Sequence, residues 1–370
     1  MNRVLVVGGA GYLGCVLTEE LLARGYSVRI FDRLYFGDAG LRHVRDRIDL
    51  VVGDMRAMNP EVLDGVQAVV NVGGLSNDPT AEYNPQANVE MNTTASLALA
   101  ELARVRDVSR YILASSASIY DVGVSDHYKD VLLDEDTPVA PRAAYSSSKY
   151  EAERGLLAMV GQDFCPVILR MGTVYGWSPR MRYDLVVNTF VKDALSRGRI
   201  TIHYGGEMWR PLVEIRDAAR AYVAAIEAPE EMVRGQVFNI ICRNFRISEL
   251  AIRVREALRS LGVQVDVDPD FGYKGVRSYR ISGEKAERVL NLKPQVGIEE
   301  SVGHMVEQIR ANHYTDWDNP RYYNIRWMKY LEEAEHIIAT TGSVFGPPRP
   351  ATASDIRPIT GRRAGTGGSA

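Results

Sequence analysis

The stretch Val4–Leu17, VLVVGGAGYLGCVL, joins an apolar run to a glycine-rich turn and then to a helical pattern. Gly8, Gly11 and Gly14 have the spacing that allows a tight turn, close approach of backbone to a pyrophosphate, and a helix packed near its strand. Such a turn directs unpaired backbone N–H groups and the positive end of the helix dipole toward a phosphate. The glycines alone are a weak signal, because a structural turn without a ligand has the same pattern.

Asp32 supplies the context that the glycines need. It follows the second apolar run, 18 positions after Gly14, near the ~20 positions at which a carboxylate meets the adenosine ribose of a dinucleotide. A carboxylate there accepts from the 2′ and 3′ hydroxyls and repels a 2′-phosphate, which favours NAD. Arg33 leaves NADP open, because a guanidinium beside this position can hold a 2′-phosphate.

Apolar, β-branched runs alternate with helical patterns over the first half of the chain. This order predicts an α/β fold, a Rossmann-type doubly wound parallel sheet with helices on both faces. The runs are continuous rather than alternating, as in strands buried on both faces. The expected strands are 3–7, 27–31, 48–52, 68–72, 110–114, 167–171 and 237–241, and the expected helices are 13–24, 88–104 and 144–159.

The rhythm of strands and helices loosens from about Gly172, which suggests a second lobe. We expect a dinucleotide-binding domain over 1–171, to which 212–262 partly returns, and a smaller substrate-binding lobe from 172–211 and 263–345. The aromatic segment WDNPRYYNIRW at 317–327 is expected to pack on its own lobe, with a cap on the site or a subunit contact as alternatives. The Pro-, Gly- and Arg-rich tail 346–370 is expected to be disordered.

Composition excludes several classes of function. The 370 residues carry a formal net charge of -3 and no basic run interleaved with aromatics, so a nucleic-acid partner is not expected. No apolar run approaches the ~20 residues that span a bilayer, so we expect a soluble, cytoplasmic protein without a membrane partner. Cys15, Cys165 and Cys242 are interpreted as buried thiols, and the histidines have no metal-ligand spacing, so no metal is expected.

A second pattern, AAYSSSK, carries chemistry. It places Tyr145 and Lys149 four residues apart at the start of a helix, and hence on one face. An ordinary tyrosine titrates near ~10, but a neighbouring ammonium and a cationic nicotinamide ring favour the phenolate. Ser116 follows the fifth strand, at the edge where open α/β sheets bind ligands, and would donate to the oxygen that Tyr145 deprotonates. An exposed Tyr and Lys pair is the plainer explanation of the spacing taken alone.

The ordered motifs resemble the extended short-chain dehydrogenase/reductase family, and in particular its NAD-dependent nucleotide-sugar epimerases and dehydratases. The resemblance runs through GGAGYLG, Asp32, GDM, SSASIY, YSSSK, LRMGTVYG and RPLVEIRD, over about residues 1–310. It implies a Rossmann domain with bound NAD(P) and a lobe that grips a nucleoside diphosphate sugar. By this resemblance Tyr145 is the catalytic base, Lys149 holds the nicotinamide ribose and lowers the pKa of Tyr145, and Ser116 positions the sugar hydroxyl.

The resemblance also assigns residues to the two ligands. Asp54 and Met55 would border the adenine, and Asn92 would steady the loop behind the active site. Besides Tyr145 and Lys149, the residues expected to contact the cofactor are Gly8, Gly11, Tyr12, Leu13, Gly14, Asp32, Arg33, Asp54, Met55, Val72, Gly73, Gly74, Asn92 and Ser115. The substrate is expected to meet Ser76, Asn77, Thr173, Arg182, Asn188, Arg210 and Arg277, with the last two at its diphosphate. Arg180 could face the sugar too, with a structural loop staple as the alternative for Arg180, Arg182 and Asn188.

Departures from the family pattern narrow the activity. Dehydratases read Thr-Asp-Glu where this chain reads Ser116, Ala117 and Ser118, so the acid and base that remove water across C5 and C6 are missing. NVGGLSNDP replaces the usual loop after the fourth strand, and Thr173 stands where an asparagine often contacts the diphosphate. These changes argue against a 4,6-dehydratase and leave the sugar open.

We therefore expect an NAD-dependent nucleotide-sugar epimerase. Tyr145 removes the proton of the C4 hydroxyl as hydride leaves C4, and the 4-keto sugar is reduced from the other face. The alternatives are an NAD(P)H-dependent 4-ketoreductase that uses the same residues, and a uronic acid decarboxylase with Arg182 as its carboxylate-binding arginine. A catalytically silent dinucleotide-binding protein would usually lack the Tyr and Lys pair.

A homodimer is expected through helices 88–104 and 144–159, which form a four-helix interface in the resembling family. Their apolar residues exceed what one inward face needs. The plainer alternative is that both helices pack only on their own sheet. The residues concerned are Val89, Leu97, Leu99, Ala100, Leu102 and Ala103 on the first helix, and Leu156, Leu157 and Met159 near the end of the second.

Overall fold

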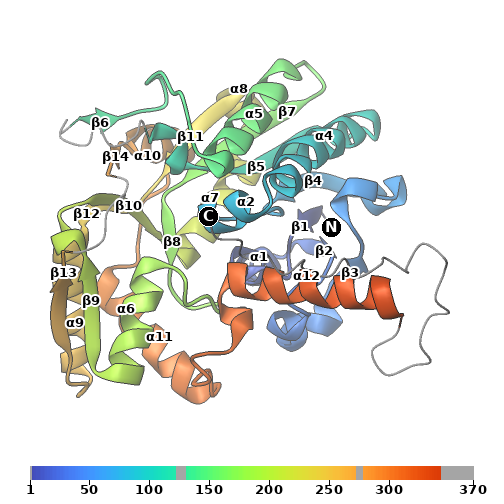
Figure 1. Ribbon diagram of the computed structural model, residues 1–370. Helices are drawn as coiled ribbons and strands as arrows, with labels where there is room; N and C mark the ends of the chain where they lie inside the picture. The colour runs from blue at the N-terminus through green and yellow to red at the C-terminus, as the bar shows by residue number, and fades with distance from the viewer. Residues whose placement is uncertain (1, 122–130, 272–277, 343–370) are drawn as a thin grey trace, which may run out of the picture. The chain divides into compact units, whose positions relative to one another are not determined.

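The computed structural model describes residues 2–121, 131–271 and 278–342 (Figure 1). Two sequence-based expectations lie outside these residues: a diphosphate contact at Arg277 and a disordered tail over 346–370. The chain divides into two units, Met1–Trp327 and Met328–Ala370. The fold and the site described below belong to the first unit.

A seven-stranded parallel sheet forms the centre of the first unit, in the order β11-β7-β5-β4-β1-β2-β3. Each expected strand is present within two residues at either end, which confirms the doubly wound α/β fold. The order reverses at β1, and sheets of this kind bind ligands in a crevice at such a switch point, here beyond the carboxyl ends of β1 and β4. The strands are β1 (Arg3–Val7), β2 (Ser27–Asp32), β3 (Ile48–Val52), β4 (Val66–Asn71), β5 (Arg110–Ser116), β7 (Cys165–Met171) and β11 (Gln236–Ile240).

Helices cover both faces of the sheet because successive strand residues point to opposite sides. Val4 and Val6 of β1 belong to one buried cluster with α1 (Tyr12–Ala23) and α7 (Ile215–Glu227). Leu5 and Val7 belong to a second cluster with α4 (Ala95–Val105) and α5 (Ala144–Ala158). In Figure 1, α4 and α5 run side by side, and the packing is close, because a Cβ on Gly155 would lie 2.6 Å from the Leu97 side chain.

The expected helix 88–104 is not continuous. It divides into α3 (Pro85–Val89), a π-helical turn (Glu90–Thr94) and α4. The turn contains Asn92, whose Nδ2 donates to the Leu75 carbonyl at 3.0 Å. A π-turn often marks a place where a side chain serves a site rather than the helix. Here it directs Asn92 to the loop that follows β4.

Shorter sheets stand beside the seven-stranded one, and all of them belong to the first unit. They are β12 (Arg243–Arg246), β10 (Trp209–Glu214) and β8 (Thr173–Tyr175); β13 (Asp266–Asp270) with β9 (Arg199–His203); and β14 (Arg280–Ile281) with β6 (Leu132–Leu133). The remaining α-helices are α2 (Asp78–Tyr83), α6 (Val186–Arg197), α8 (Glu230–Val233), α9 (Ile247–Ser260), α10 (Glu284–Leu290), α11 (Ile298–Ala311) and α12 (Asn324–Thr341). The 3-10 turns include η1 (Ala39–Arg47), η5 (Ala117–Tyr120) and η8 (Pro320–Tyr322).

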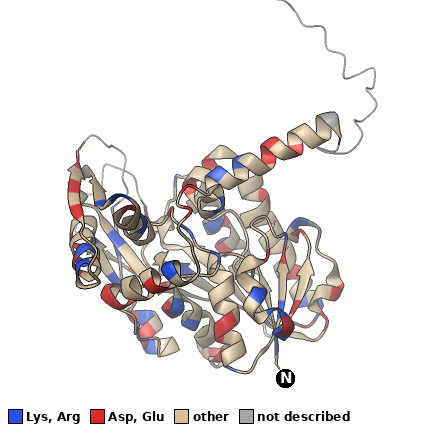
Figure 2. Cartoon of the chain, turned by 90° about the horizontal axis from the view of Figure 1, so that it is seen from below, with Lys and Arg blue, Asp and Glu red and all other residues tan. Residues whose placement is uncertain are grey.

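The distribution of charged residues and the burial of the cysteines match the sequence-based expectations only in part. Lys and Arg are interspersed with Asp and Glu over the helices and strands in Figure 2. Cys15 and Cys165 are buried free thiols, but Cys242 is partly exposed, so the expectation of three buried thiols is wrong there. Cys242 lies in the connection after β11, past the last buried position of that strand.

Within the described residues, no helix has the length and apolarity needed to span a membrane. In the same residues, His, Cys, Asp and Glu form no group of three suited to a metal ion.

Candidate active site

The glycine turn after β1 is shaped for a close ligand. Gly8 has a φ of 80°, and a Cβ on Gly14 would lie only 2.3 Å from the Gly8 carbonyl oxygen. Gly11 is the N-cap of α1, and no side chain caps the helix there. The first N–H groups of α1 are therefore left for an anion. A cradle that any Cβ would fill, next to an uncapped helix start, fits the pyrophosphate of a dinucleotide.

Asp32 is fixed at the end of β2. Its Oδ2 accepts from the backbone N–H of Ala10 at 2.9 Å, and its Oδ1 accepts from that of Leu34 at 2.7 Å. Burial raises the pKa of Asp32, and these two hydrogen bonds oppose the rise. Each carboxylate oxygen keeps a further lone pair. Asp32 can therefore accept from ribose hydroxyls without leaving its place.

Arg33 is turned toward acidic and aromatic partners. Its Nη1 donates to Asp54 Oδ2 at 2.8 Å and to the Tyr35 hydroxyl at 2.6 Å. Asp54 also pairs with Arg56 at 2.6 Å, and hydrogen bonding from Arg56 lowers the pKa of Asp54 to about 2. The guanidinium of Arg33 is thus engaged by its neighbours rather than held open for a 2′-phosphate.

We expect NAD(H) to bind at least ~10-fold more tightly than NADP(H), because a 2′-phosphate would meet the Asp32 carboxylate and lose Arg33 to Asp54. Titration of both reduced cofactors by nicotinamide fluorescence measures the ratio. Arg33→Ala should leave the preference unchanged. A preference for NADPH that disappears in Arg33→Ala would show that Arg33, not Asp32, controls the pocket.

Tyr145 and Ser116 meet at the carboxyl edge of β5. Tyr145 lies in the first turn of α5, and its phenol interacts with Ser116. Ser116 Oγ accepts from the Ser118 backbone N–H at 3.1 Å and donates to Ser118 Oγ at 2.9 Å. Burial raises the pKa of Tyr145 to about 12, while Ser116 and the charge of Arg182 oppose the rise. Burial thus outweighs the groups that oppose it, and the lowering by Lys149 stays a prediction. A cationic nicotinamide ring beside the phenol would favour the phenolate further.

Lys149 lies one turn further along α5 and is only 4% exposed. Burial lowers its pKa to about 8, and the carboxylate of Glu153 opposes this fall. Its ammonium is thus close to its titration point in the physiological range. Small changes in the charges around it will decide its protonation.

A buried ion pair that the sequence analysis missed lies behind Lys149. Glu153 and Arg170 are 1% and 5% exposed, and Arg170 Nη2 lies 2.7 Å from Glu153 Oε2. Ser115 donates to the same carboxylate, and Arg170 Nη1 donates to the Tyr120 hydroxyl at 2.7 Å. The spacing of four from Lys149 to Glu153 was the available signal, because it places both side chains on one face of the helix.

Two loops join beside Tyr145 on the substrate side. Arg182 is buried; its Nε donates to Asp184 Oδ1 at 2.8 Å and its Nη1 to Ser76 Oγ at 3.2 Å. Asn77 Nδ2 contacts Asp184 Oδ2 at 3.4 Å and its Oδ1 caps α2. The loop after β4 and the loop after β8 therefore hold one another next to the catalytic candidates.

Other predicted substrate residues serve the protein itself. Asn188 Oδ1 accepts from the Gly176 N–H at 3.0 Å, and its Nδ2 donates to the Tyr12 hydroxyl at 3.1 Å, so it acts as a loop staple. Arg210 donates to the Trp209 carbonyl at 2.8 Å. Thr173 pairs with β10 in the small sheet.

The predicted cofactor residues after β4 lie against the glycine turn. A Cβ on Gly8 would be 2.6 Å from Gly73 Cα, and one on Gly73 would be 3.5 Å from the sulfur of Met55. Gly74 has a φ of 116°, and a Cβ there would meet the Asn92 side chain at 2.1 Å. The remaining predicted cofactor residues in these segments are Leu13 in α1 and Val72, whose N–H donates to the Val7 carbonyl.

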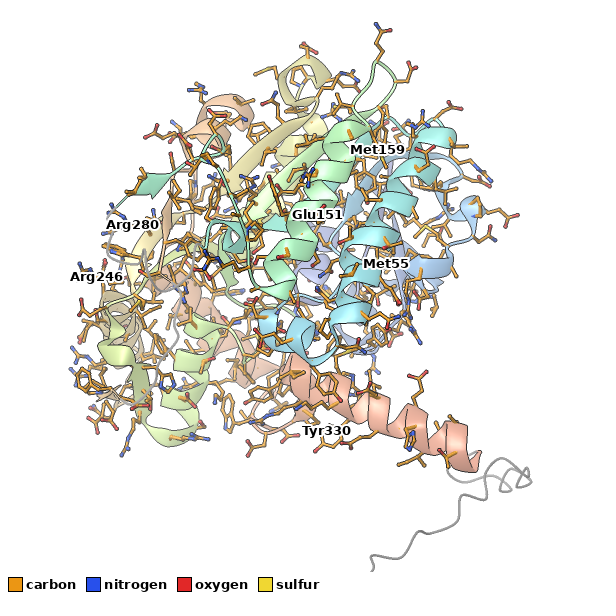
Figure 3. All side chains as sticks on the ribbon, turned by 45° about the horizontal axis from the view of Figure 1, so that its top comes forward. Met55, Glu151, Met159, Arg246, Arg280 and Tyr330 are labelled. Carbon is orange, nitrogen blue, oxygen red and sulfur yellow. The ribbon has the colours of Figure 1, made fainter. Side chains whose placement is uncertain are left out.

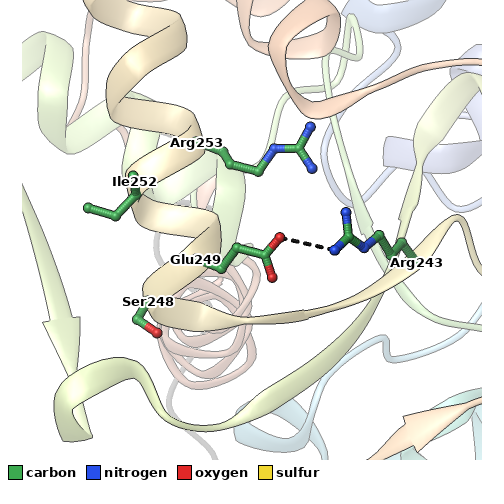
Figure 4. Close-up of a pocket in the computed structure, with 5 residues that line it drawn as sticks. All are labelled: Arg243, Ser248, Glu249, Ile252 and Arg253. Carbon is green, nitrogen blue, oxygen red and sulfur yellow. Dashed lines mark ion pairs between the residues drawn. The ribbon is translucent and has the colours of Figure 1, made fainter.

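A separate hollow of about 690 Å³ lies on α9 and β12 (Figure 4). Its lining residues are Arg243, Ser248, Glu249, Ile252 and Arg253. Arg243 pairs with Glu249 at 3.3 Å, the dashed line in Figure 4, and Arg253 pairs with Glu299 at 2.7 Å. The charges of this hollow are thus already paired, and it shares no residue with the crevice described above.

The glycine turn and Asp32 can hold a dinucleotide, and Tyr145 with Ser116 and Lys149 can transfer a proton. This combination is typical of an oxidoreductase site on a Rossmann fold. The profile of the NAD dependent epimerase/dehydratase family matches residues 4–240. The chain belongs to this family, and its cofactor is NAD. The family resemblance stated above is thereby confirmed.

Relatives with several activities are similar to this chain. It is 27% identical over 331 residues to the UDP-glucose 4-epimerase of Mycolicibacterium smegmatis, covering 83% of this chain and 98% of that protein. It is 24% identical over 322 residues to UDP-glucuronic acid decarboxylase 1 of Xenopus tropicalis, covering 84% and 72%. The structure of MoeE5 in complex with UDP-glucuronic acid and NAD is 26% identical with a TM-score of 0.70, covering 84% and 100%.

Proposed function

We propose that the protein is an NAD-dependent epimerase that oxidises and re-reduces a nucleoside diphosphate sugar at C4. The observation that carries the proposal is that the first turn of α5 brings Tyr145 to Ser116 at the carboxyl end of β5. A proton acceptor and a hydroxyl that can contact one sugar oxygen are the groups that alcohol oxidation needs. Ala117 follows Ser116, where a dehydratase would need an acid.

The proposed steps use few side chains. NAD, when bound, accepts a hydride and returns it. Tyr145 takes the proton of the C4 hydroxyl and gives it back after the 4-keto sugar has turned its other face, while Ser116 keeps the oxygen in place. Lys149, buried beneath, supplies positive charge that favours the phenolate. No net oxidant or reductant is consumed.

The second candidate is a uronic acid decarboxylase, since decarboxylases are among the relatives. It needs a cation for the sugar carboxylate, and Arg182 is the candidate in this chain. Arg182 donates through Nε and Nη2 to Asp184 and through Nη1 to Ser76. With these donors engaged, Arg182 is poorly placed to take a further carboxylate, which favours the epimerase.

Small molecules released from the denatured pure protein test the proposal. We expect NAD(H) at close to one per chain by mass spectrometry, with no added cofactor needed for activity. UDP-hexoses are the first substrates to try, because UDP-sugars occur in the names of the relatives, and the cytoplasm is the expected compartment. Release of NADPH, or a need for stoichiometric reductant, would support the 4-ketoreductase instead.

We also propose a homodimer through α4 and α5, which run side by side in Figure 3 from Glu151 to Met159 of α5. Part of the apolar surplus faces the chain's own core, since Leu99 and Leu156 are buried. Val105 and Leu157 remain 63% and 37% exposed, and an isologous contact would cover them.

Light scattering at micromolar concentration should give twice the mass of the 41.2 kDa chain. Leu157→Glu, which places a charge opposite its own copy, should shift the protein toward monomer without changing its thermal unfolding by more than a few degrees. A wild-type mass equal to one chain would contradict the dimer.

A further inference from the structure

The segment Tyr314–Trp327, called here the C-terminal strap, is anchored on the loop that follows β8. The Tyr183 N–H donates to the Tyr322 carbonyl at 2.9 Å, and the Tyr183 hydroxyl donates to the Tyr314 carbonyl at 2.7 Å. The Tyr183 ring packs against those of Trp317 and Tyr322. The strap therefore has the packing on its own lobe that its aromatic composition suggests.

The strap also crosses to the dinucleotide side. Trp327 Nε1 donates to the carbonyl of Tyr35, three residues after Asp32. Asn324, only 8% exposed, donates through Nδ2 to Ser76 Oγ at 2.8 Å and through its backbone N–H to Asp184 Oδ2 at 3.1 Å. One short segment thus contacts the loops after β2, β4 and β8, three of the loops that border the crevice.

Asn324 has a third partner, Arg180, whose Nη2 donates to Asn324 Oδ1 at 2.6 Å. The Arg180 guanidinium is buried and lies 3.6 Å from the centroid of the Phe36 ring. Within the described residues, its Nε has no hydrogen-bond partner. A buried cation with an unused donor is costly unless an anion completes it.

Arg180 lies next to the dinucleotide cradle. Its backbone N–H meets the thiol of Cys15 in the first turn of α1, and its charge opposes the raised pKa of Asp32. Two residues earlier, Ser178 Oγ donates to the Tyr12 carbonyl at 2.7 Å. The carboxylates of Asp184 and Asp32 also act on the Arg180 charge. The diphosphate of a dinucleotide bound at the start of α1 is a further anion that the fold provides for near it.

We propose that the C-terminal strap is a retaining cover for the cofactor, in which Asn324 holds Arg180 toward the dinucleotide and Trp327 closes the loop that follows Asp32. The strap lies beyond residue 240, where the family profile ends. The match to the MoeE5 structure covers 100% of MoeE5 but only 84% of this chain. The proposal rests on NAD binding and holds whichever sugar reaction follows.

The test measures cofactor release, so it does not require a known substrate. Wild-type protein, Asn324→Ala, Trp327→Phe and the double variant are loaded with NADH, and the dissociation rate is followed by loss of nicotinamide fluorescence on dilution into excess NAD. We expect each single variant to release NADH at least ~10-fold faster, the size of one lost hydrogen bond to a charged or buried group, and the double variant faster still. Asn312→Ala, the same substitution at an exposed asparagine outside the strap, should behave as wild type.

Circular dichroism and thermal unfolding show which variants are folded. Trp327→Phe keeps an aromatic ring but removes the pyrrole part of the indole with its Nε1 donor, so it decides the question if Asn324→Ala does not fold. Release at the wild-type rate in folded Trp327→Phe or the folded double variant would overturn the proposal. Fast NADH release from the variants supports the strap proposal whether or not the wild-type protein converts a sugar nucleotide. Fast release together with a wild-type protein that shows no sugar turnover would contradict the proposed function and leave the strap proposal standing.

Discussion

Tyr145→Phe is expected to lower sugar-nucleotide turnover by at least ~10²-fold while the fold and the bound NAD are kept, because one positioned acid/base group contributes about that much. The substitution removes only the hydroxyl that meets Ser116. Turnover is measured by chromatography of the sugar nucleotides, and bound NAD by release from the denatured protein.

Tyr150→Phe is the matched control for this prediction. It removes a hydroxyl from the same helix, five residues further on, where the Tyr150 ring packs with a separate apolar cluster. It should retain wild-type turnover within about 2-fold, since the ring is kept and no catalytic group is lost. Normal turnover in Tyr145→Phe would remove Tyr145 from the chemistry.

Glu153→Gln is expected to cause the largest loss of stability. It leaves the Arg170 guanidinium buried without its carboxylate, and breaking a buried pair in this way costs about 3–5 kcal/mol. Urea unfolding measures this loss. Glu151→Gln, an exposed carboxylate two residues earlier that pairs with Arg154 at 3.4 Å, should change stability by less than about 0.5 kcal/mol. Equal effects of the two substitutions would contradict the account of the buried pair.

The same substitution should change the pH profile of the reaction. Lys149 has its pKa lowered to about 8 by burial, and Glu153 opposes that fall. Without the carboxylate, the pKa of Lys149 drops further, so the ammonium is lost at a lower pH. The alkaline limb of turnover should therefore move to lower pH in Glu153→Gln and stay in place in Glu151→Gln. An unmoved limb in a folded Glu153→Gln variant would mean that Lys149 does not act through its charge.

Local sequence patterns predicted the central sheet, the glycine turn after its first strand, and the pair Tyr145 and Lys149. Strand runs buried on both faces and a glycine turn are properties of neighbouring residues, so the sequence displays them directly. The Tyr145 and Lys149 spacing is equally local. The prediction of a continuous helix over 88–104 was wrong because it misses the π-turn. At this turn Asn92 donates to the carbonyl of Leu75, which lies 17 residues away in the sequence.

Contacts distant in sequence could not be predicted. The Arg180 to Asn324 hydrogen bond joins residues 144 positions apart, and no periodicity reports such a pair. The pKa of Tyr145 illustrates a second limit, because the sequence gives the charges near a group but not its burial. Desolvation decided its direction here.

The central claim is that this chain epimerises a nucleotide sugar at C4 with its own NAD. Purified protein is incubated with UDP-glucose and, separately, with UDP-glucuronic acid, with no added cofactor, and the products are followed by proton NMR together with nicotinamide absorbance. We predict that at least one of the two gives a reversible mixture of C4 epimers, with no loss of carbon or water and no net change in NADH. Loss of the sugar carboxylate, or turnover only with stoichiometric NAD(P)H, would contradict the epimerase assignment.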